Sequence, residues 1–166
     1  MTSAATAQAP DPVVSLRWRR SLPLLIAGAV SVIAGGLAAA VTGPTEWSKG
    51  SWVAAFLVLV AGVAQIGLGA GQAYLAVTTP TVAFVTAEVV MWNVACATVI
   101  AGTLLSSPAT VAVGSVPLVA ALVMFMVALS DRSGAQRSII VVGYRLLLLV
   151  VLVSVPIGVA LSFARH

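Results

Sequence analysis

Long apolar runs dominate this sequence and constrain its fold more than any other feature. They cover residues 22–41, 51–75, 81–105, 109–129 and 139–161. A helix needs about 20 apolar residues to cross the hydrocarbon core of a bilayer, and each run reaches that length. Backbone groups in lipid must be hydrogen-bonded within the protein, and these runs lack the polar–apolar alternation of barrel strands. The sequence therefore predicts an all-α membrane bundle of five transmembrane helices.

The composition agrees with a chain whose main solvent and partner is the lipid bilayer. Hydrophobic residues make up 61% of the sequence and charged residues 7%, whereas soluble domains carry about 25% charged residues. The net charge of +4 comes from basic residues that flank the apolar runs. This placement favours membrane topology over nucleic-acid binding. Ala, Val and Gly are abundant and arginine outnumbers lysine, which is typical of a high-GC bacterium. We therefore expect the protein in the plasma membrane of such a bacterium.

Two regions are expected. Residues 1–16 are rich in Ala, Thr, Pro and Gln, which predicts a disordered cytoplasmic tail. Residues 17–166 are expected to form a single five-helix domain. An alternative for the first run is a cleaved signal peptide, because arginines precede it and the small residues 38–40 resemble a cleavage site. The run is longer than a signal core of about 7–15 residues and four more runs follow, which favours an uncleaved helix.

The basic residues also predict an orientation. Arginines occur in residues 17–20, before the first run, and in the loop 130–138 between the fourth and fifth runs. Four crossings separate these two clusters, which places them on the same side of the membrane, with Lys49 and Arg165 on the other. Because positive charge concentrates on the cytoplasmic side, we expect the N-terminus inside and the C-terminus outside.

Two charged residues lie within the predicted spans, Glu88 in the third and Arg145 in the fifth. An isolated charge at the bilayer centre costs about 2.5–3.5 kcal/mol on insertion scales. Glu88 follows Thr81 by seven residues and Arg145 follows Ile139 by six. Both therefore lie about 10 Å from the inner end of their helices, given the helical rise. We expect them to form a charge pair, directly or through water.

Three amides extend this polarity. Gln65 in the second run and Asn93 in the third fall at similar depth, which predicts a hydrogen bond between the two helices. Gln72 shares a helix face with Gln65 and comes close to the depth of Glu88. Together with Arg145, these residues form a predicted polar seam in the inner half of the bundle. The seam is either structural, holding helices in register, or a site that binds an ion or a substrate.

Small residues recur at helix-packing spacing. Gly67 and Gly71 form a GxxxG pattern, and residues 27, 31, 35 and 39 are all small. Such patterns allow close approach between helices, inside the bundle or between copies of the chain. The composition of the chain, with many Ala and Gly residues, also produces them by chance. Prolines at 117 and 156 predict kinks in the fourth and fifth helices.

The sequence contains none of the motifs that signal catalysis, phosphate binding or metal binding. Cys96 is the only cysteine and His166 the only histidine. We therefore expect no catalytic residue, no metal and no cofactor. The favoured function is a non-enzymatic accessory or self-associating structural component of a membrane, with a homo-oligomer or a membrane protein as partner. The alternative is a small transporter or channel that uses the polar seam.

Overall fold

The computed structural model describes residues 12–76, 78–130, 142–143, 146 and 148–149. The elements bounded within these ranges are helices: α1 (Pro12–Thr42), α2 (Gly50–Phe56), η1 (Leu57–Ala64), α3 (Gln65–Leu75), α4 (Val82–Leu104) and α5 (Pro108–Ser130). The segments α2, η1 and α3 follow one another without a break, and η1 has the wider π-helical turn. The all-helical prediction is confirmed for this part of the chain.

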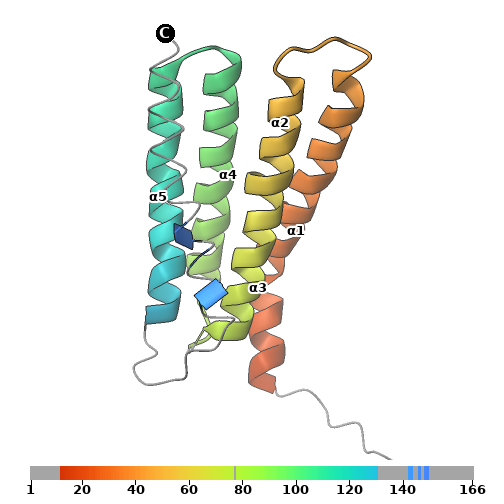
Figure 1. The fold of residues 1–166 in the computed structure, drawn as a ribbon. Coiled ribbons are helices and arrows are strands. Elements are labelled where there is room, and N and C mark those ends of the chain that lie inside the picture. The colour runs from red at the N-terminus through yellow and green to blue at the C-terminus, as the bar shows by residue number, and fades with distance from the viewer. Residues whose placement is uncertain (1–11, 77, 131–141, 144–145, 147, 150–166) are drawn as a thin grey trace, which may run out of the picture.

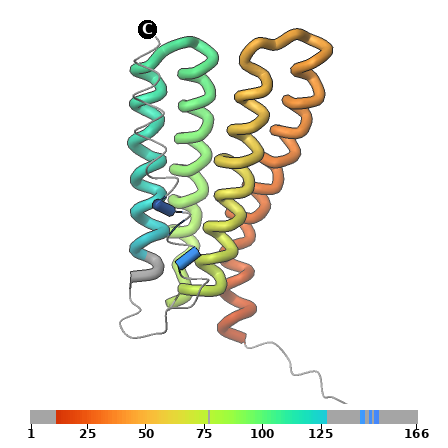
Figure 2. Tube along the Cα trace, viewed as in Figure 1, coloured from red at the N-terminus to blue at the C-terminus, as the bar shows by residue number. Residues whose placement is uncertain are grey.

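The helices form two antiparallel hairpins, as Figure 1 shows. One consists of α1 against the continuous rod α2–η1–α3, and the other of α4 against α5. Both hairpins turn at the same end of the molecule, and the link between α3 and α4 lies at the opposite end, which is clear in the tube of Figure 2. The hairpins are joined where α4 contacts α1 and η1, and where α3 contacts α5.

Within the described residues, four helical segments are long and apolar enough to cross a membrane: Pro12–Thr42, Gly50–Leu75, Val82–Leu104 and Pro108–Val127. They match the first four predicted runs. The predicted fifth span, residues 139–161, lies almost wholly outside the described residues, so the count of five stays a prediction. The first helix begins at Pro12 rather than at residue 22 and so includes residues 12–16 of the predicted tail. The other tail residues, 1–11, lie outside the described part.

The start of α4 is capped by a side chain. The helix begins at Val82, and Thr81 is its N-cap. The Thr81 hydroxyl accepts a hydrogen bond from the Phe84 backbone N–H at 3.2 Å. An N-cap needs extended backbone and an oxygen that reaches the third helical amide. Thr81 meets both needs, with ψ of 155°.

Glycines set the distance between α1 and the second rod. A Cβ atom added at Gly28 would lie 2.9 Å from the backbone oxygen of Gly62, and one added at Gly35 would lie 2.9 Å from that of Ala54. These helices therefore pack backbone against backbone. Gly35 belongs to the predicted small-residue stripe and is buried, whereas Ala39 of the same stripe is exposed. Gly28, outside that stripe, is the second glycine of α1 at this contact.

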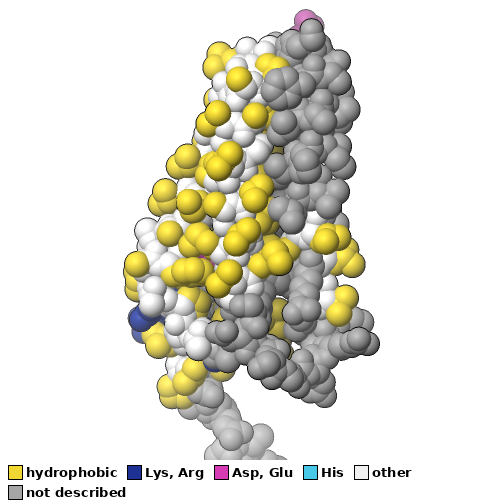
Figure 3. Space-filling model, turned by 90° about the vertical axis from the view of Figure 1, so that its left-hand side faces the viewer, with side chains coloured by type: hydrophobic (Ala, Val, Ile, Leu, Met, Phe, Trp, Pro, Cys, Tyr) yellow, Lys and Arg dark blue, Asp and Glu magenta, His cyan; other side chains and the backbone are white. Residues whose placement is uncertain are grey.

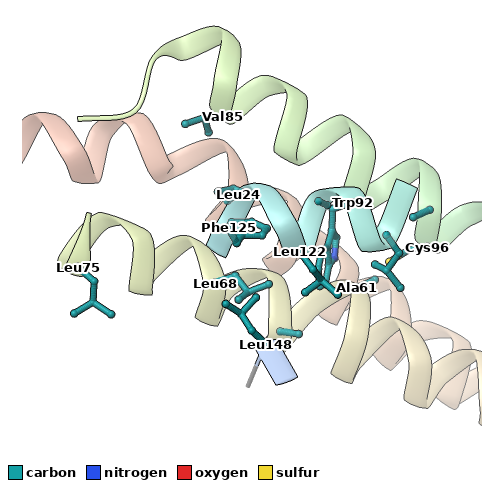
Figure 4. Packing of buried hydrophobic residues seen from close by; sticks show 14 residues of the cluster. Leu24, Ala61, Leu68, Leu75, Val85, Trp92, Cys96, Leu122, Phe125 and Leu148 are labelled. Atoms are coloured by element: carbon teal, nitrogen blue, oxygen red, sulfur yellow. The ribbon is translucent and has the colours of Figure 1, made fainter. Parts of the chain in front are cut away.

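The core lies between the two hairpins. Trp92 of α4 is fully buried and packs edge-to-face on Phe125 of α5, with ring centroids 6.1 Å apart. Figure 4 shows both rings beside Leu122 near the centre of the cluster. Outward-facing positions are also apolar, and α1 exposes large side chains along its length, including Ile26, Ile33 and others. On the face shown in Figure 3, hydrophobic side chains cover the helices from end to end. Such a surface suits lipid rather than water.

Candidate buried polar site

Two of the described polar residues of the predicted seam, Gln72 and Glu88, are in contact. Gln72 lies in the last turns of α3 and Glu88 in the second turn of α4. The Gln72 side-chain nitrogen Nε2 donates a hydrogen bond to Oε1 of Glu88 at 3.3 Å. Both side chains are fully buried. The predicted similarity in depth between these two residues is confirmed.

Several polar atoms around this bond have no hydrogen-bond partner among the described residues. They are Oε2 of Glu88, Oε1 of Gln72, both side-chain polar atoms of Gln65, the hydroxyl of Ser21 and the indole nitrogen of Trp92. All five side chains are fully buried. Leaving a buried polar group unpaired costs about 1–3 kcal/mol. The unpaired atoms make this region the costliest part of the described interior.

The predicted hydrogen bond between Gln65 and Asn93 is wrong. The Asn93 side-chain nitrogen donates to the backbone oxygen of Val89 in its own helix, at 2.8 Å. Both side-chain polar atoms of Gln65 are unpaired in the described structure. An asparagine in a helix can reach the carbonyl one turn before it, and this local bond competes with a bond to another helix. Equal depth therefore did not suffice to bring these amides together.

The other predicted contact of the site cannot be placed. Arg145 lies outside the described residues, so its pairing with Glu88 stays a prediction. Of the predicted site residues, Gln65, Gln72 and Glu88 are therefore the ones that the described structure buries.

Two residues outside the predicted seam also lie at this site. Gly69 of α3 lies against Leu24 of α1, and Gly62 of η1 lies against Gly28. This antiparallel register places Ser21, one turn before Leu24, near the level of Gln72. A lone serine in an apolar helix gives no signal in the sequence. Its complete burial, with an unpaired hydroxyl, is visible only in the fold.

Trp92 is the second such residue. It follows Glu88 by four residues and therefore lies one turn farther along the same face of α4. The structure buries the ring fully and leaves its indole N–H without a partner in the described part. The indole therefore adds an unpaired hydrogen-bond donor to the site.

The helix geometry changes next to the site. The π-helical segment η1 ends at Ala64, and Gln65 is the first residue of α3. Wide turns of this kind are rare and occur often at functional sites. Residues 57–64 read as an ordinary apolar helix in the sequence, so nothing there predicts the wider turn. Gln65 is thus positioned by a local feature that only the structure shows.

Basic side chains tie the two hairpins together at both ends of the bundle. Lys49, in the loop after α1, donates from Nζ to the backbone oxygens of Thr103 and Leu104, at 2.8 and 3.1 Å. These carbonyls lie in the last turn of α4, where intrahelical donors run out, and that of Thr103 also accepts from the Ser106 backbone N–H at 3.2 Å. At the other end, Nη1 of Arg20 donates to the backbone oxygen of Pro80 at 3.1 Å. The polar site lies between these two ties, nearer to that of Arg20.

Comparison with known proteins adds no relative. No family model, no curated protein and no solved structure matches the chain. The site must therefore be interpreted from its own chemistry. It offers one carboxyl group, two carboxamides, one hydroxyl and one indole N–H, all of which form hydrogen bonds. This set can hold helices in register, and it can bind a proton or a small polar molecule.

Proposed function

We propose that this protein is a non-enzymatic component of the plasma membrane, acting as an accessory subunit or by self-association. The observation that carries the proposal is that the buried polar residues stop halfway through the described bundle. Ser21, Gln65, Gln72 and Glu88 are the buried polar side chains of the described helices, and all lie in the half that holds the α3–α4 link. A pathway that conducts a solute across the bundle would need polar contacts in the other half as well.

In the other half of the described bundle, α4 and α5 pack tightly against each other. A Cβ atom added at Gly102 of α4 would lie 2.7 Å from the backbone nitrogen of Val111 in α5. The hydroxyls of Thr98 and Thr103 bond to carbonyls of their own helix. Buried positions of α4 beyond Trp92 are apolar or glycine. These contacts support a packed membrane component, with its exposed apolar faces available to lipid or to another membrane helix.

We further propose the topology that the sequence predicts, with five spans, the N-terminus in the cytoplasm and the C-terminus outside. Three arginines, Arg17, Arg19 and Arg20, lie near the start of α1, and Lys49 follows its end. This excess of positive charge at the N-terminal end agrees with a cytoplasmic N-terminus. Cys96 is buried, so single cysteines introduced at Ser3 and at Ser162 can be labelled selectively in intact cells. A membrane-impermeant maleimide should label Ser162→Cys and not Ser3→Cys. Labelling of both or neither would contradict the proposed topology.

Crosslinking tests the accessory role. A photo-reactive amino acid is introduced in native membranes at Ile33 of α1, which is 64% exposed, or at Val113 of α5, which is 66% exposed. Leu24, which is fully buried, serves as the control position. We expect an adduct with another protein or a second copy from at least one exposed site, and none from Leu24. Lipid adducts alone, together with a monomer in mild detergent, would contradict the proposal.

A small transporter or channel is the second candidate, and the unpaired atoms of Gln65, Gln72 and Glu88 favour it. A transported ion or solute would supply the partners that these atoms lack. The test is solute flux into liposomes that contain the purified chain. Glu88→Gln should then change the flux or its dependence on pH, and an unchanged flux would exclude this role for the glutamate.

A further inference from the structure

Two of the four side-chain polar atoms in the pair Gln72–Glu88 form a hydrogen bond, and the other two do not. One bond joins Nε2 of Gln72 to Oε1 of Glu88. The second oxygen of each group, Oε1 of Gln72 and Oε2 of Glu88, is buried without a partner in the described structure. We propose that Glu88 is a proton-binding site, and that the bound proton closes a second hydrogen bond to Gln72 in a cyclic acid–amide pair.

The chemistry of the two groups fits this arrangement. A protonated carboxyl group has one O–H donor and one carbonyl acceptor, and a carboxamide has N–H donors and one carbonyl acceptor. A proton taken from water onto Oε2 of Glu88 creates an O–H that donates to Oε1 of Gln72. The existing bond from Nε2 runs in the opposite direction and completes the ring. No bond is broken within the protein, and both unpaired oxygens acquire a partner.

A carboxylate could not form this ring. Both of its oxygens only accept hydrogen bonds, so Oε2 and the carboxamide oxygen of Gln72 would be two acceptors without a donor between them. The carboxylate would also carry its charge into a fully buried position between helices, where uncompensated charge is costly. Proton binding removes the charge and supplies the missing donor in one step, without needing space for a larger ligand.

Few charged groups of the described chain lie near the carboxyl group. Of the elements packed against α4 or bonded to it, η1 and α5 contain no titratable side chain. α3 has only Tyr74, which is exposed. α4 itself has Cys96, two turns farther along. α1 has the arginines of residues 17–20, and Arg20 is directed to the backbone oxygen of Pro80. Arg145 lies outside the described residues, and the variant Arg145→Gln tests whether it pairs with Glu88.

Infrared spectroscopy tests the proposal directly, because a protonated carboxyl group absorbs separately from a carboxylate. The full chain is reconstituted in vesicles of phosphatidylcholine and phosphatidylglycerol at neutral pH. It has only four acidic residues, Asp11, Glu46, Glu88 and Asp131, so the carboxyl region is simple. We expect one carboxylic-acid band in the native protein. The band should be lost in Glu88→Gln and kept when the other three acids are all replaced by their amides.

Two further measurements separate the proton from an ion pair. Gln72→Leu removes the acceptor for the O–H, so the acid band should move to the higher frequency of a carboxyl group without that bond. Glu88→Gln restores two amide–amide bonds in place of the acid–amide ring, so its thermal midpoint should stay at the native value. A native protein with no acid band would overturn the proposal. So would a lower midpoint in Glu88→Gln that Arg145→Gln abolishes, which would indicate an ionised Glu88 paired with Arg145.

This inference is independent of the accessory role, since a proton-binding residue can hold helices together whether or not the protein has partners. Crosslinking therefore tests only the accessory role, and the infrared spectrum tests only proton binding by Glu88.

Discussion

The close contact of α1 with the second rod at Gly28 gives the sharpest prediction for stability. Replacing Gly28 by alanine should destabilise the bundle, because the new methyl group would lie 2.6 Å from Cγ1 of Ile66 and 2.9 Å from the backbone oxygen of Gly62. The isoleucine can change its rotamer, but the carbonyl belongs to the helix backbone. α1 must therefore move away from η1 to accommodate the methyl group.

The magnitude follows from two opposing effects. Overpacking of a well-packed interior costs about 1–3 kcal/mol. Replacing glycine by alanine inside a helix gains about 0.5–1 kcal/mol in helix propensity. Gly36 is the matched control, because it lies in the same helix and a Cβ atom there would meet nothing within 4 Å. The propensity gain is the same for both variants and cancels, so Gly28→Ala should be less stable than Gly36→Ala by about 1–3 kcal/mol.

The assay is unfolding of the purified chain by SDS in mixed micelles, followed by tryptophan fluorescence. Four tryptophans are present, and buried Trp92 contacts α5, so loss of packing should change the emission. Equal free energies of unfolding for the two variants would refute the close approach of α1 and η1. A Gly28→Ala protein more stable than the Gly36→Ala protein would refute it more strongly.

Other variants test the ties and contacts between the helices. Lys49→Met should lower the free energy of unfolding by about 1 kcal/mol, since it removes a charged donor to the end of α4 that is partly exposed and so partly screened; an unchanged value in the same SDS assay would show that this tie contributes nothing. Gly102→Ala should be less stable than the helical control Gly36→Ala by about 1–3 kcal/mol, because the added atom at Gly102 meets the backbone of Val111. Equal free energies of unfolding for these two variants would argue against this contact.

The membrane character and the helix boundaries could be predicted largely from the sequence, because both depend on local properties. The length of an apolar run determines whether it can span the hydrocarbon core, and cap residues act within one turn. The second run, 51–75, and the fourth, 109–129, agree with the described helices to within one residue at each end. The first helix is longer than its apolar run because the more polar residues 12–21, which precede the run, are also helical.

The candidate site could be predicted only in part. The sequence predicted that Gln72 and Glu88 lie at similar depth, but the hydrogen bond between their side chains is visible only in the structure. Depth alone did not predict that Asn93 would bond to its own helix. The rotation of a helix about its axis, and the competition from local acceptors, decide which of two amides at the same level face each other.

The sequence by itself determined that the chain forms apolar helices, because the lengths of its runs and the scarcity of charge leave no other way to satisfy the backbone in lipid. Only the tertiary structure decided which polar atoms share the interior and which lack partners. That outcome depends on helix register, which the contacts of Gly28 with Gly62 and of Gly69 with Leu24 set. Such contacts are spread over several helices, and no single stretch of sequence contains them. This register brings the hydroxyl of Ser21 to the level of Gln72 and leaves Glu88 with one bond made and one to be completed by a proton.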